Sequence, residues 1–374
     1  MRLTSESNDK DDSESSSRLR SNGNEPWILH ALRMTKYKFR ITFAAKSGRI
    51  NFMNKLLATF TAPTNNLLQS EVWQEYEESL GNTTFRVSCD TASALLIKMP
   101  LYKDKNFLYC PRGPMCTKEG WHVFLRKVRE IAVRENCVFV RVEPYSLPNG
   151  ITKELGFHKV GQYSPLSKQF SPMDTQILDI SKRDDDLLLE MKPKWRYNIK
   201  VAYRKGVTVR SSNKLEDVKK FHEMSVGMHD RGYTPFDLTH YERLVYALAR
   251  GKHIKLYIAE YQKQPLSMIL VTHFGEVATY LHGASNNEFR EFMPNHLVQW
   301  EAMLDAKRAG CTVYDFWGVA PDDDEAHPWA GITSFKKGFS GETVHFVGAF
   351  DYPFSPLWYN MLHAYNFLRK ITKK

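Results

Sequence analysis

The feature that most constrains the fold is an internal similarity between the two halves of the chain. The segment ENCVFVRV at 135–142 resembles AGCTVYDF at 309–316, and ELGF at 154–157 resembles KKGF at 336–339. The offsets are 174 and 182 residues, which is too long for a solenoid repeat. Each of the longer segments follows a long helical pattern and is apolar enough for a buried strand. We therefore expect a duplicated unit of mixed strands and helices, with an α/β or α+β fold.

The chain of 374 residues is long enough for about two domains. Its start, residues 1–26, is Ser-rich and polar and indicates disorder. We predict a disordered or unassigned extension over residues 1–60. A first domain is predicted over 61–180 and a second domain over 181–374.

Several helix starts are predicted from capping residues. Ser70 is placed to cap a helix at about 72–80. Asn213 with Glu216, and Thr239 with Glu242, have capping-box spacing, so helices are expected from about 214 and 240.

The charge balance indicates an anionic partner. The formal net charge is +10, and residues 1–26 contribute four basic and six acidic groups, so the rest of the chain carries about +12. A folded body this basic suggests binding to an anion. The alternative is a basic surface that contacts only water.

The most basic stretch is MKPKWRYNIKVAYRKGVTVR at 191–210, with seven Lys or Arg and no acidic residue. Pro193 suits the first turn of a helix, and Gly206 suits its end. Arg196, Lys200 and Arg204 recur every four residues and form one basic ridge. An apolar face lies beside it, formed by Trp195, Ile199 and Ala202. The spacing predicts a ridge that faces phosphate, but does not distinguish RNA from a phosphorylated small molecule.

Other patterns bound the location and the cofactors. Five cysteines without a CxxC pair argue against a disulfide framework and a zinc site. The acidic run at 322–325 has no recognisable ligand spacing, so a solvated loop is favoured over a metal site. No run of 18 apolar residues and no secretory signal is present. We expect a cytoplasmic protein with no metal and no cofactor.

Four stretches, in order, resemble one known family. They are FLYCPRGPM at 107–115, the basic stretch at 191–209, the segment at 280–319 from YLHGAS to YDFWGV, and HPWAGITSFKKGF at 327–339. These resemble motifs of the FemABX family of non-ribosomal peptidyltransferases, and the resemblance runs from about residue 66 to 355. The first 60 residues lie outside it.

The resemblance implies two tandem acetyltransferase-like (GNAT) domains. Because no long heptad segment is visible, the chain looks like the members without a coiled-coil arm. It also implies transfer of an amino acid from aminoacyl-tRNA to an amine on the stem peptide of a peptidoglycan precursor. The implied partners are aminoacyl-tRNA and a UDP-linked muropeptide or lipid II. A peripheral contact with the inner membrane surface is compatible with that acceptor, and DNA is not expected as a partner.

The resemblance also assigns candidate residues. Lys336 in SFKKGF would stabilise the transition state, with Lys337 as the weaker alternative, and Phe335 would wall the same site. Residues that would contact the acceptor are Arg112, Arg231, Tyr280 and Tyr241, with Tyr233 competing for the position of Tyr241 and His282 standing where an aromatic is expected. The ridge of Arg196, Lys200 and Arg204 would bind tRNA.

Aminolysis of an ester needs removal of a proton from the attacking amine and stabilisation of the oxyanion, but no covalent nucleophile. Some family members carry an Asp base soon after the PRGP turn, whereas Cys116, Thr117 and Lys118 follow it here. Solvent or the substrate itself is then expected to take the proton. Two alternatives stay open: a GNAT-type N-acyltransferase with another acyl donor, and a non-catalytic RNA-binding protein. The first lacks its pyrophosphate-binding turn here, and the second lacks a common RNA-binding signature.

Overall fold

A computed structural model describes residues 47–160, 171–229, 234–321 and 324–372. The contacts divide the chain into residues 1–50 and 51–374. The described part of the first unit is the beginning of helix α2 (Ser47–Thr61). The second unit carries both β-sheets.

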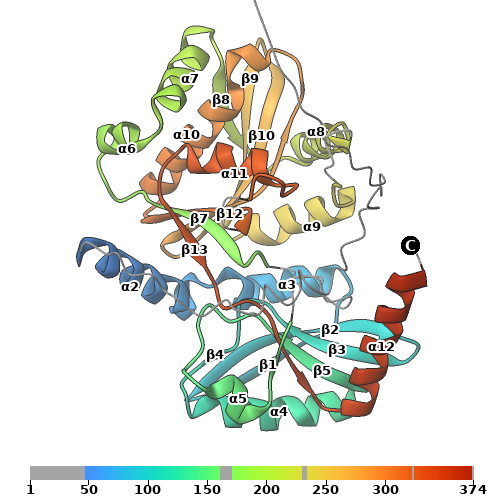
Figure 1. The fold of residues 1–374 in the computed structure, drawn as a ribbon. Coiled ribbons are helices and arrows are strands. Elements are labelled where there is room, and N and C mark those ends of the chain that lie inside the picture. Colours follow the sequence, from blue (N-terminus) through green and yellow to red (C-terminus); the bar gives the residue numbers. More distant parts are fainter. Residues whose placement is uncertain (1–46, 161–170, 230–233, 322–323, 373–374) are drawn as a thin grey trace, which may run out of the picture. The chain divides into compact units, whose positions relative to one another are not determined.

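The second unit contains two mixed sheets, each drawn as a separate set of arrows in Figure 1. The first sheet has the order β1-β2-β3-β5-β14-β6, with β4 beside β2. Its strands are β1 Thr84–Cys89, β2 Ala92–Tyr102, β3 Lys105–Cys110, β4 Met115–Cys116, β5 Cys137–Val142, β6 His158–Lys159 and β14 Phe350–Pro353. The second sheet has the order β13-β7-β12-β11-β10-β9-β8. Its strands are β7 Asp174–Asp179, β8 Thr208–Ser212, β9 Ile254–Tyr261, β10 Gln264–Phe274, β11 Val277–Ser285, β12 Val313–Gly318 and β13 Glu342–His345.

The two sheets share one pairing pattern, centred on the two strands of the sequence similarity. Strand β5 is parallel to β3 and antiparallel to β14. Strand β12 is likewise parallel to β11 and antiparallel to β7. Beyond these, β3-β2-β1 and β11-β10-β9 continue antiparallel. The prediction of a mixed α/β chain with two similar halves is confirmed.

The strands of the two sheets are exchanged along the chain. Strand β7 follows the first half in sequence but joins the second sheet, and β14 near the C-terminus joins the first sheet. The expected boundary at 180/181 therefore does not separate the sheets strictly. The expected boundary at 60/61, between the extension and the first domain, lies inside α2. Leu56 and Phe60 of this helix are buried in a core with Ile177 and Val313. The limits of the domains themselves, and the lack of an arm, stay predictions.

Helices cover both faces of each sheet. In the first sheet, α4 packs on the face of Leu108 and Val140, and α12 packs on the face of Phe107 and Val138. In the second sheet, α7, α10 and Phe335 of α11 share one core, while α8 and α9 share another with Tyr76 of α3. The helix bounds are α3 Glu71–Ser79, α4 Gly120–Arg134, α5 Ile151–Leu155, α6 Asp184–Glu190, α7 Pro193–Arg204, α8 Leu215–Val226, α9 Leu238–Ala249, α10 Pro294–Arg308, α11 Ala330–Lys337 and α12 Pro356–Thr372, with short 3-10 turns η2 Pro63–Asn65, η3 Leu67–Gln69 and η5 Arg290–Phe292. None of the helices in the described ranges is long and apolar enough to cross a bilayer.

Two of the expected helix ends are confirmed by their caps. The Ser70 hydroxyl accepts the backbone N–H of Trp73 at 3.2 Å and starts α3. Helix α7 begins at Pro193, and Gly206 follows its end with φ of +79°. That left-handed conformation costs glycine little, so the sequence predicts the stop correctly.

The two helices expected from capping boxes are present as α8 and α9, but the predicted capping residues are wrong. The side chain of Asn213 donates to the Ile254 carbonyl at 3.0 Å, which ties it to the start of β9 instead of capping α8. Helix α9 begins at Leu238, and the carboxylate of Asp237 accepts the His240 N–H at 2.8 Å. Thr239 therefore lies inside the helix, because Asp237 offers a cap two residues earlier.

Candidate active site

The site begins where β11 and β12 separate, which we call the β11–β12 divergence. The two strands pair over only three positions, from Val277–Val313 to Thr279–Asp315. Strand β11 then continues along β10, and β12 continues beside β7 with an irregular register between Asp315 and Gly318. Trp317 lies in this irregular part with φ of +62°, in the left-handed region. An irregular strand end re-aims side chains that a regular strand would hold in alternation.

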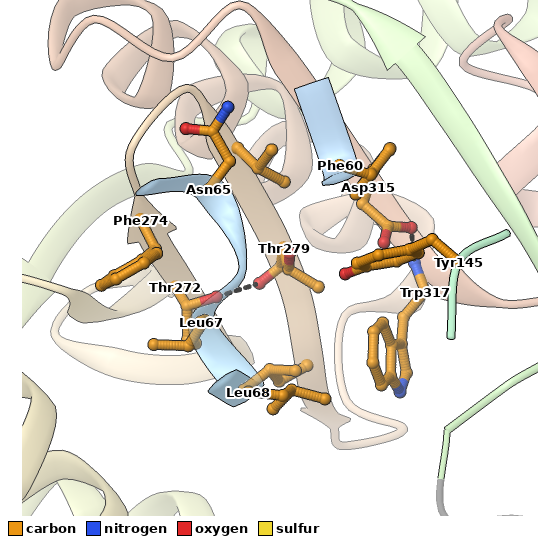
Figure 2. Close-up of a pocket in the computed structure, with 12 residues that line it drawn as sticks. Phe60, Asn65, Leu67, Leu68, Tyr145, Thr272, Phe274, Thr279, Asp315 and Trp317 are labelled. Carbon is orange, nitrogen blue, oxygen red and sulfur yellow. Dashed lines mark hydrogen bonds between the residues drawn. The ribbon is translucent and has the colours of Figure 1, made fainter. Parts of the chain in front are cut away.

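A small open pocket lies beside this divergence (Figure 2). Asp315, Trp317 and Tyr145 lie close together in it, and Asn65, Thr272 and Phe274 lie across from them in the view. The full lining is Phe60, Asn65, Leu67, Leu68, Tyr145, Thr272, Phe274, Val277, Thr279, Leu281, Asp315 and Trp317. Because Tyr145 follows β5 while Asp315 belongs to β12, both halves of the chain contribute to this mostly apolar pocket with few polar groups.

Asp315 is a carboxyl group buried in an apolar strand. Its Oδ1 accepts the backbone N–H of Trp317 at 2.8 Å. The residue paired with Asp315 on the neighbouring strand β7 is Ile177. Burial raises the pKa of Asp315 to about 6, and the Trp317 hydrogen bond with the charges of Arg112 and Lys336 limits the rise. The carboxyl group is thus able to change its charge close to neutral pH.

Lys336, near the end of α11, is a buried cation that interacts with the charge of Asp315. Its Nζ donates to the carbonyl of Gly318 at 2.7 Å and lies 5.5 Å from the centre of the Tyr280 ring. Only 6% of the residue is exposed. Burial lowers its pKa to about 7, and the charge of Asp315 opposes that shift. Lys337 is more exposed than Lys336, so the structure distinguishes the two lysines of the SFKKGF motif.

Phe335 supports the helix that carries Lys336. Its carbonyl accepts the indole N–H of Trp195 at 3.0 Å, which links α11 to α7. Its ring lies 5.3 Å from the ring of His296 and 5.2 Å from that of Phe339. These contacts place Phe335 in the core between α7, α10 and α11, so it holds α11 in place next to the candidate lysine.

Arg112 lies in the PRGP turn and packs against the pocket from the first half. Its guanidinium donates to the Pro172 carbonyl at 2.6 Å and lies 4.4 to 5.4 Å from the ring centres of Phe346, Tyr145 and Trp317. The residue is only 3% exposed, so it orders Tyr145 and Trp317 from behind the pocket.

Gln69 of η3 holds the PRGP turn in place. Its Nε2 donates to the Pro111 carbonyl at 2.5 Å, and its Oε1 accepts the N–H of Leu95 at 2.7 Å. A Cβ at Gly113 would lie 2.7 Å from the Gln69 side chain, so the turn requires glycine there.

Tyr241 lies inside a cluster of aromatic and histidine rings. It is fully buried, its hydroxyl accepts the N–H of Phe236 at 3.3 Å, and its ring lies 5.3 Å from that of His282. Burial and the neighbouring His240 lower the pKa of His282 to about 3, so His282 is neutral. The cluster positions the start of α9. Arg231 and Tyr233 lie outside the described residues.

The basic ridge of α7 divides into two parts. Arg196 Nη1 donates to the carbonyls of Leu189 and Met191, both at 2.8 Å, and so caps the end of α6. Lys200 and Arg204 are exposed. The expected apolar face is confirmed, since Ile199 and Ala202 are buried and Trp195 packs against the same core.

Comparison with known proteins shows the family. The model of the FemAB family matches residues 55–154, 151–262 and 246–367. The chain belongs to the FemAB family. It is 25% identical to the lipid II:glycine glycyltransferase of Staphylococcus aureus (strain USA300), an alignment that covers 80% of this chain and 91% of that protein. The resemblance based on the four motifs is confirmed.

Solved structures show the same fold. The crystal structure of FemX matches with a TM-score of 0.73 and 24% identity over 83% of this chain and 98% of that one. The structure of L-PGS from Bacillus licheniformis matches with a TM-score of 0.53 and 10% identity over 83% and 95%. With its FemAB relatives named as glycyltransferases, the chain is an acyltransferase.

Asp315, Trp317 and Tyr145 are candidate site residues of this FemAB protein that the sequence analysis missed. A signal for Asp315 exists, because VYDFWG places one carboxylate in an otherwise apolar strand. A buried carboxylate without a charged neighbour in the sequence is a reason to search for a site. Tyr145 carries no such signal, because its place in the pocket depends on packing between the two halves.

Proposed function

We propose that this protein transfers an amino acid from aminoacyl-tRNA to the side-chain amine of the stem peptide of a peptidoglycan precursor, UDP-MurNAc-pentapeptide or lipid II, and so builds the interpeptide bridge. Membership of the FemAB family and the name of its glycyltransferase relatives support the reaction class. The observation that carries the proposal is the buried Lys336 at the β11–β12 divergence, with its pKa lowered to about 7. Because aminoacyl-tRNA is the donor, we place the activity in the cytoplasm.

The reaction would break the ester bond between the amino acid and the tRNA and form an amide bond. The acceptor amine, once neutral, attacks the ester carbonyl, and negative charge develops on its oxygen. Lys336 in its ammonium form has three donors, of which one is used by the Gly318 carbonyl. We assign another donor to the oxyanion, where a fixed cation shielded from water stabilises charge most strongly. The tRNA ribose oxygen leaves and takes up the proton that the attacking nitrogen loses, so the products are the amide and the uncharged tRNA.

Asp315 and Tyr280 complete the surroundings of this lysine. The negative charge of Asp315 favours the ammonium form that the oxyanion needs. The ring of Tyr280 beneath Nζ stabilises the same cation through its π-face. We assign Tyr280 to the acceptor side of the site, and Arg112 and Phe335 to positioning the pocket and α11. Arg231 is proposed for the acceptor phosphates from the resemblance alone.

Lys200 and Arg204 are proposed to contact the tRNA backbone. Both are exposed on α7, and Trp195 of the same helix is bound to the carbonyl of Phe335 in the helix of Lys336. The ridge is thus physically connected to the helix that carries the candidate lysine. Arg196, which caps α6, would contribute to this surface only by holding it in shape.

The test is incubation of the purified protein with charged tRNA and either UDP-muropeptide or lipid II, followed by mass spectrometry of the acceptor. An increase in mass by one or more amino-acid residues supports the proposal. Acylation with acetyl-CoA in place of charged tRNA would instead support an N-acyltransferase of another kind. RNA binding without any transfer would contradict the proposed reaction.

A further inference from the structure

Asp315 differs from the other buried carboxylates of this protein in its hydrogen bonds. Five carboxylates are buried in the described part of the chain, and four of them accept a hydrogen bond from a side chain. These four are Glu143 with Tyr109, Asp174 with His345, Asp217 with Arg210 and Asp351 with Arg141. Among the described residues, Asp315 accepts only the backbone N–H of Trp317, through Oδ1. A buried carboxylate that lacks a donor is costly, so a ligand that supplies one is bound favourably.

Two cations act on Asp315 from a distance, and both have partners of their own. Arg112 and Lys336 supply the positive charges that limit the rise in the pKa of Asp315. Arg112 donates to the Pro172 carbonyl, and Lys336 donates to the Gly318 carbonyl. Within the described ranges, neither cation forms a hydrogen-bonded ion pair with Asp315. Its second oxygen, Oδ2, is therefore available to a ligand in the pocket that Asp315 lines.

The walls of this pocket suit a cation carried on a hydrocarbon chain. Figure 2 shows the rings of Tyr145 and Trp317 beside the Asp315 carboxylate. The faces of aromatic rings attract an ammonium group, and a carboxylate forms a strong hydrogen bond with it. Leu67 and Leu281 line the same pocket and can cover the methylene groups of an aliphatic chain. A primary ammonium on an unbranched chain matches both kinds of surface.

The pocket and Lys336 lie on opposite faces of the second sheet. Thr279 of β11 lines the pocket, whereas the next residue, Tyr280, packs against the core of α7 and α10 and lies 5.5 Å from Lys336 Nζ. On β12, Tyr314 is buried in that core, so Asp315 lies on the other face, because side chains alternate along a strand. Both charged groups lie where the pairing of β11 with β12 ends. A nucleophile bound at Asp315 and a carbonyl bound at Lys336 would therefore meet from opposite faces.

We propose that Asp315 binds the ammonium group of the acceptor amine and takes up its proton, with Tyr145 and Trp317 as the aromatic walls of this ammonium site. The inference rests on the proposed function, which supplies the acceptor and the reaction. The donor also carries an ammonium, beside its ester. However, Lys200 and Arg204, proposed for the tRNA, belong to α7, which packs on the face of Lys336. The acceptor amine is thus assigned to the pocket face, and the tRNA ester to the other.

Two protons leave the acceptor nitrogen at different stages. The ammonium gives the first proton to Oδ2 of Asp315, which leaves a neutral amine and a neutral carboxyl group. The amine attacks the ester carbonyl, and the nitrogen loses its second proton to the ribose oxygen as the ester bond breaks. Asp315 releases its proton to water after the amide product has left. Asp315 thus acts before the new bond forms, and Lys336 acts while the ester oxygen is negative.

The first test measures binding and requires no transfer. Calorimetry compares UDP-muropeptide whose stem peptide carries lysine with the same compound carrying norleucine, which keeps the methylene chain and lacks the ammonium. The wild type is expected to bind the lysine form about tenfold more tightly, because only this form supplies a donor to Oδ2. Asp315→Asn is expected to bind both forms alike. Asp185→Asn, the same change at an exposed position of α6, should keep the wild-type preference.

Equal affinity of the wild type for the two forms overturns the proposal, and so does an Asp315→Asn variant that keeps the preference. Thermal unfolding checks that the variant is folded, and the comparison on the wild type alone decides the matter if it is not. The preference also separates ammonium binding from the effect of Asp315 on Lys336, because that effect does not depend on the acceptor.

Transfer assays separate this inference from the proposed function. With the lysine acceptor, kcat/KM of Asp315→Asn is expected to fall at least about 100-fold. With an aminooxy acceptor, whose amine is neutral at pH 7, the loss should be about tenfold at most, because only the effect on Lys336 remains. Equal losses with the two acceptors overturn the proposal. A lysine preference in binding without transfer by the wild type would sink the proposed function and leave the ammonium site standing.

A change of donor identifies which ammonium Asp315 binds. Hydroxyacyl-tRNA keeps the ester and replaces the donor's ammonium by a hydroxyl group. The loss caused by Asp315→Asn is expected to be the same with hydroxyacyl-tRNA and with aminoacyl-tRNA, because the acceptor is unchanged. A loss that occurs only with aminoacyl-tRNA would place the donor's ammonium at Asp315 and overturn the assignment to the acceptor.

Discussion

The two sheets follow one plan, but their central parallel pairs differ. In the first sheet, β3 and β5 stay paired to Cys110–Val142, and the next amide, of Glu143, donates to the carbonyls of Cys110 and Gly113 at 3.2 Å. In the second sheet, the pairing of β11 with β12 stops at Thr279–Asp315. The first sheet is closed by backbone hydrogen bonds where the second one opens into a pocket.

The two sheets also differ in the charged residue at the equivalent position of β5 and β12, which is Arg141 in the first sheet and Asp315 in the second. Arg141 pairs with Tyr109 in the first sheet as Asp315 pairs with Thr279 in the second, and the sequence similarity aligns the two strands. Arg141 makes two 2.8 Å hydrogen bonds to Asp351, its direct neighbour on β14. The residue paired with Asp315 on β7 is Ile177, which carries no charge. The buried charge of Arg141 is neutralised by a carboxylate, whereas burial raises the pKa of Asp315 to about 6.

Removing Arg141 should have the largest effect of the changes considered, and it should act on stability. Arg141→Met leaves Asp351 buried without its cation, which is expected to lower the free energy of unfolding by about 3–5 kcal/mol. Chemical denaturation of the purified variant measures this. The double variant Arg141→Met/Asp351→Leu should recover most of the loss, and a single variant within about 1 kcal/mol of the wild type would contradict a structural role for the pair.

The pH dependence of transfer should follow the protonation of Lys336. If its ammonium stabilises the oxyanion, the ratio of kcat/KM between the wild type and Lys336→Met falls about tenfold per pH unit above a pKa of about 7. The ratio removes the deprotonation of the acceptor amine, which is the same for both proteins. The sign for stability is opposite: the folded pKa lies below the ordinary value of 10.5, so the unfolded chain binds more protons between these values. The penalty for burying this cation is therefore full below pH 7 and is relieved as the pH rises toward 10.5. A ratio that increases through this range would show that Lys336 acts as a neutral base instead.

Asp315 should set the pH at which the contribution of Lys336 to the rate begins to fall. In Asp315→Asn the nearby negative charge is lost, so the pKa of Lys336 drops further and the alkaline fall in rate begins up to about one pH unit earlier. The pH–rate profile of the variant gives the shift, with Glu276→Gln at an exposed position as the control. An unmoved profile would mean that the two groups do not interact across the β11–β12 divergence.

The smallest expected effect concerns the exposed part of the α7 ridge. Lys200→Glu/Arg204→Glu should weaken tRNA binding and lower the slope of log affinity against log salt by about 1 to 2, because two phosphate contacts are lost. Filter binding over a salt series measures both. Lys219→Glu/Lys220→Glu on α8 carries the same charge change at exposed positions. If both pairs change the slope equally, the ridge is no more than part of a general basic surface.

Local features of this fold could be predicted from the sequence, and non-local ones could not. Pro193 and Gly206 specify the limits of α7 by their own backbone geometry, and the similarity of β5 to β12 predicts the duplication. The exchange of β7 and β14 between the sheets depends on pairing between distant segments, which leaves no local pattern. Arg196 looked like a free phosphate ligand on the helical wheel, but α6 folds back onto it. The lysine of the site was found through a family motif. Asp315 becomes a candidate only in the structure, because it lies where the pairing of β11 with β12 ends.

The central claim, that the open parallel pair of the second sheet is the catalytic centre and depends on Lys336, has a direct test. The rate of a single turnover with charged tRNA and saturating UDP-muropeptide is measured for Lys336→Met and for its neighbour Lys337→Met. We expect a loss of about 10²- to 10³-fold for Lys336→Met, with acceptor affinity little changed, and a nearly normal rate for Lys337→Met. A folded Lys336→Met protein that transfers at the wild-type rate would contradict it.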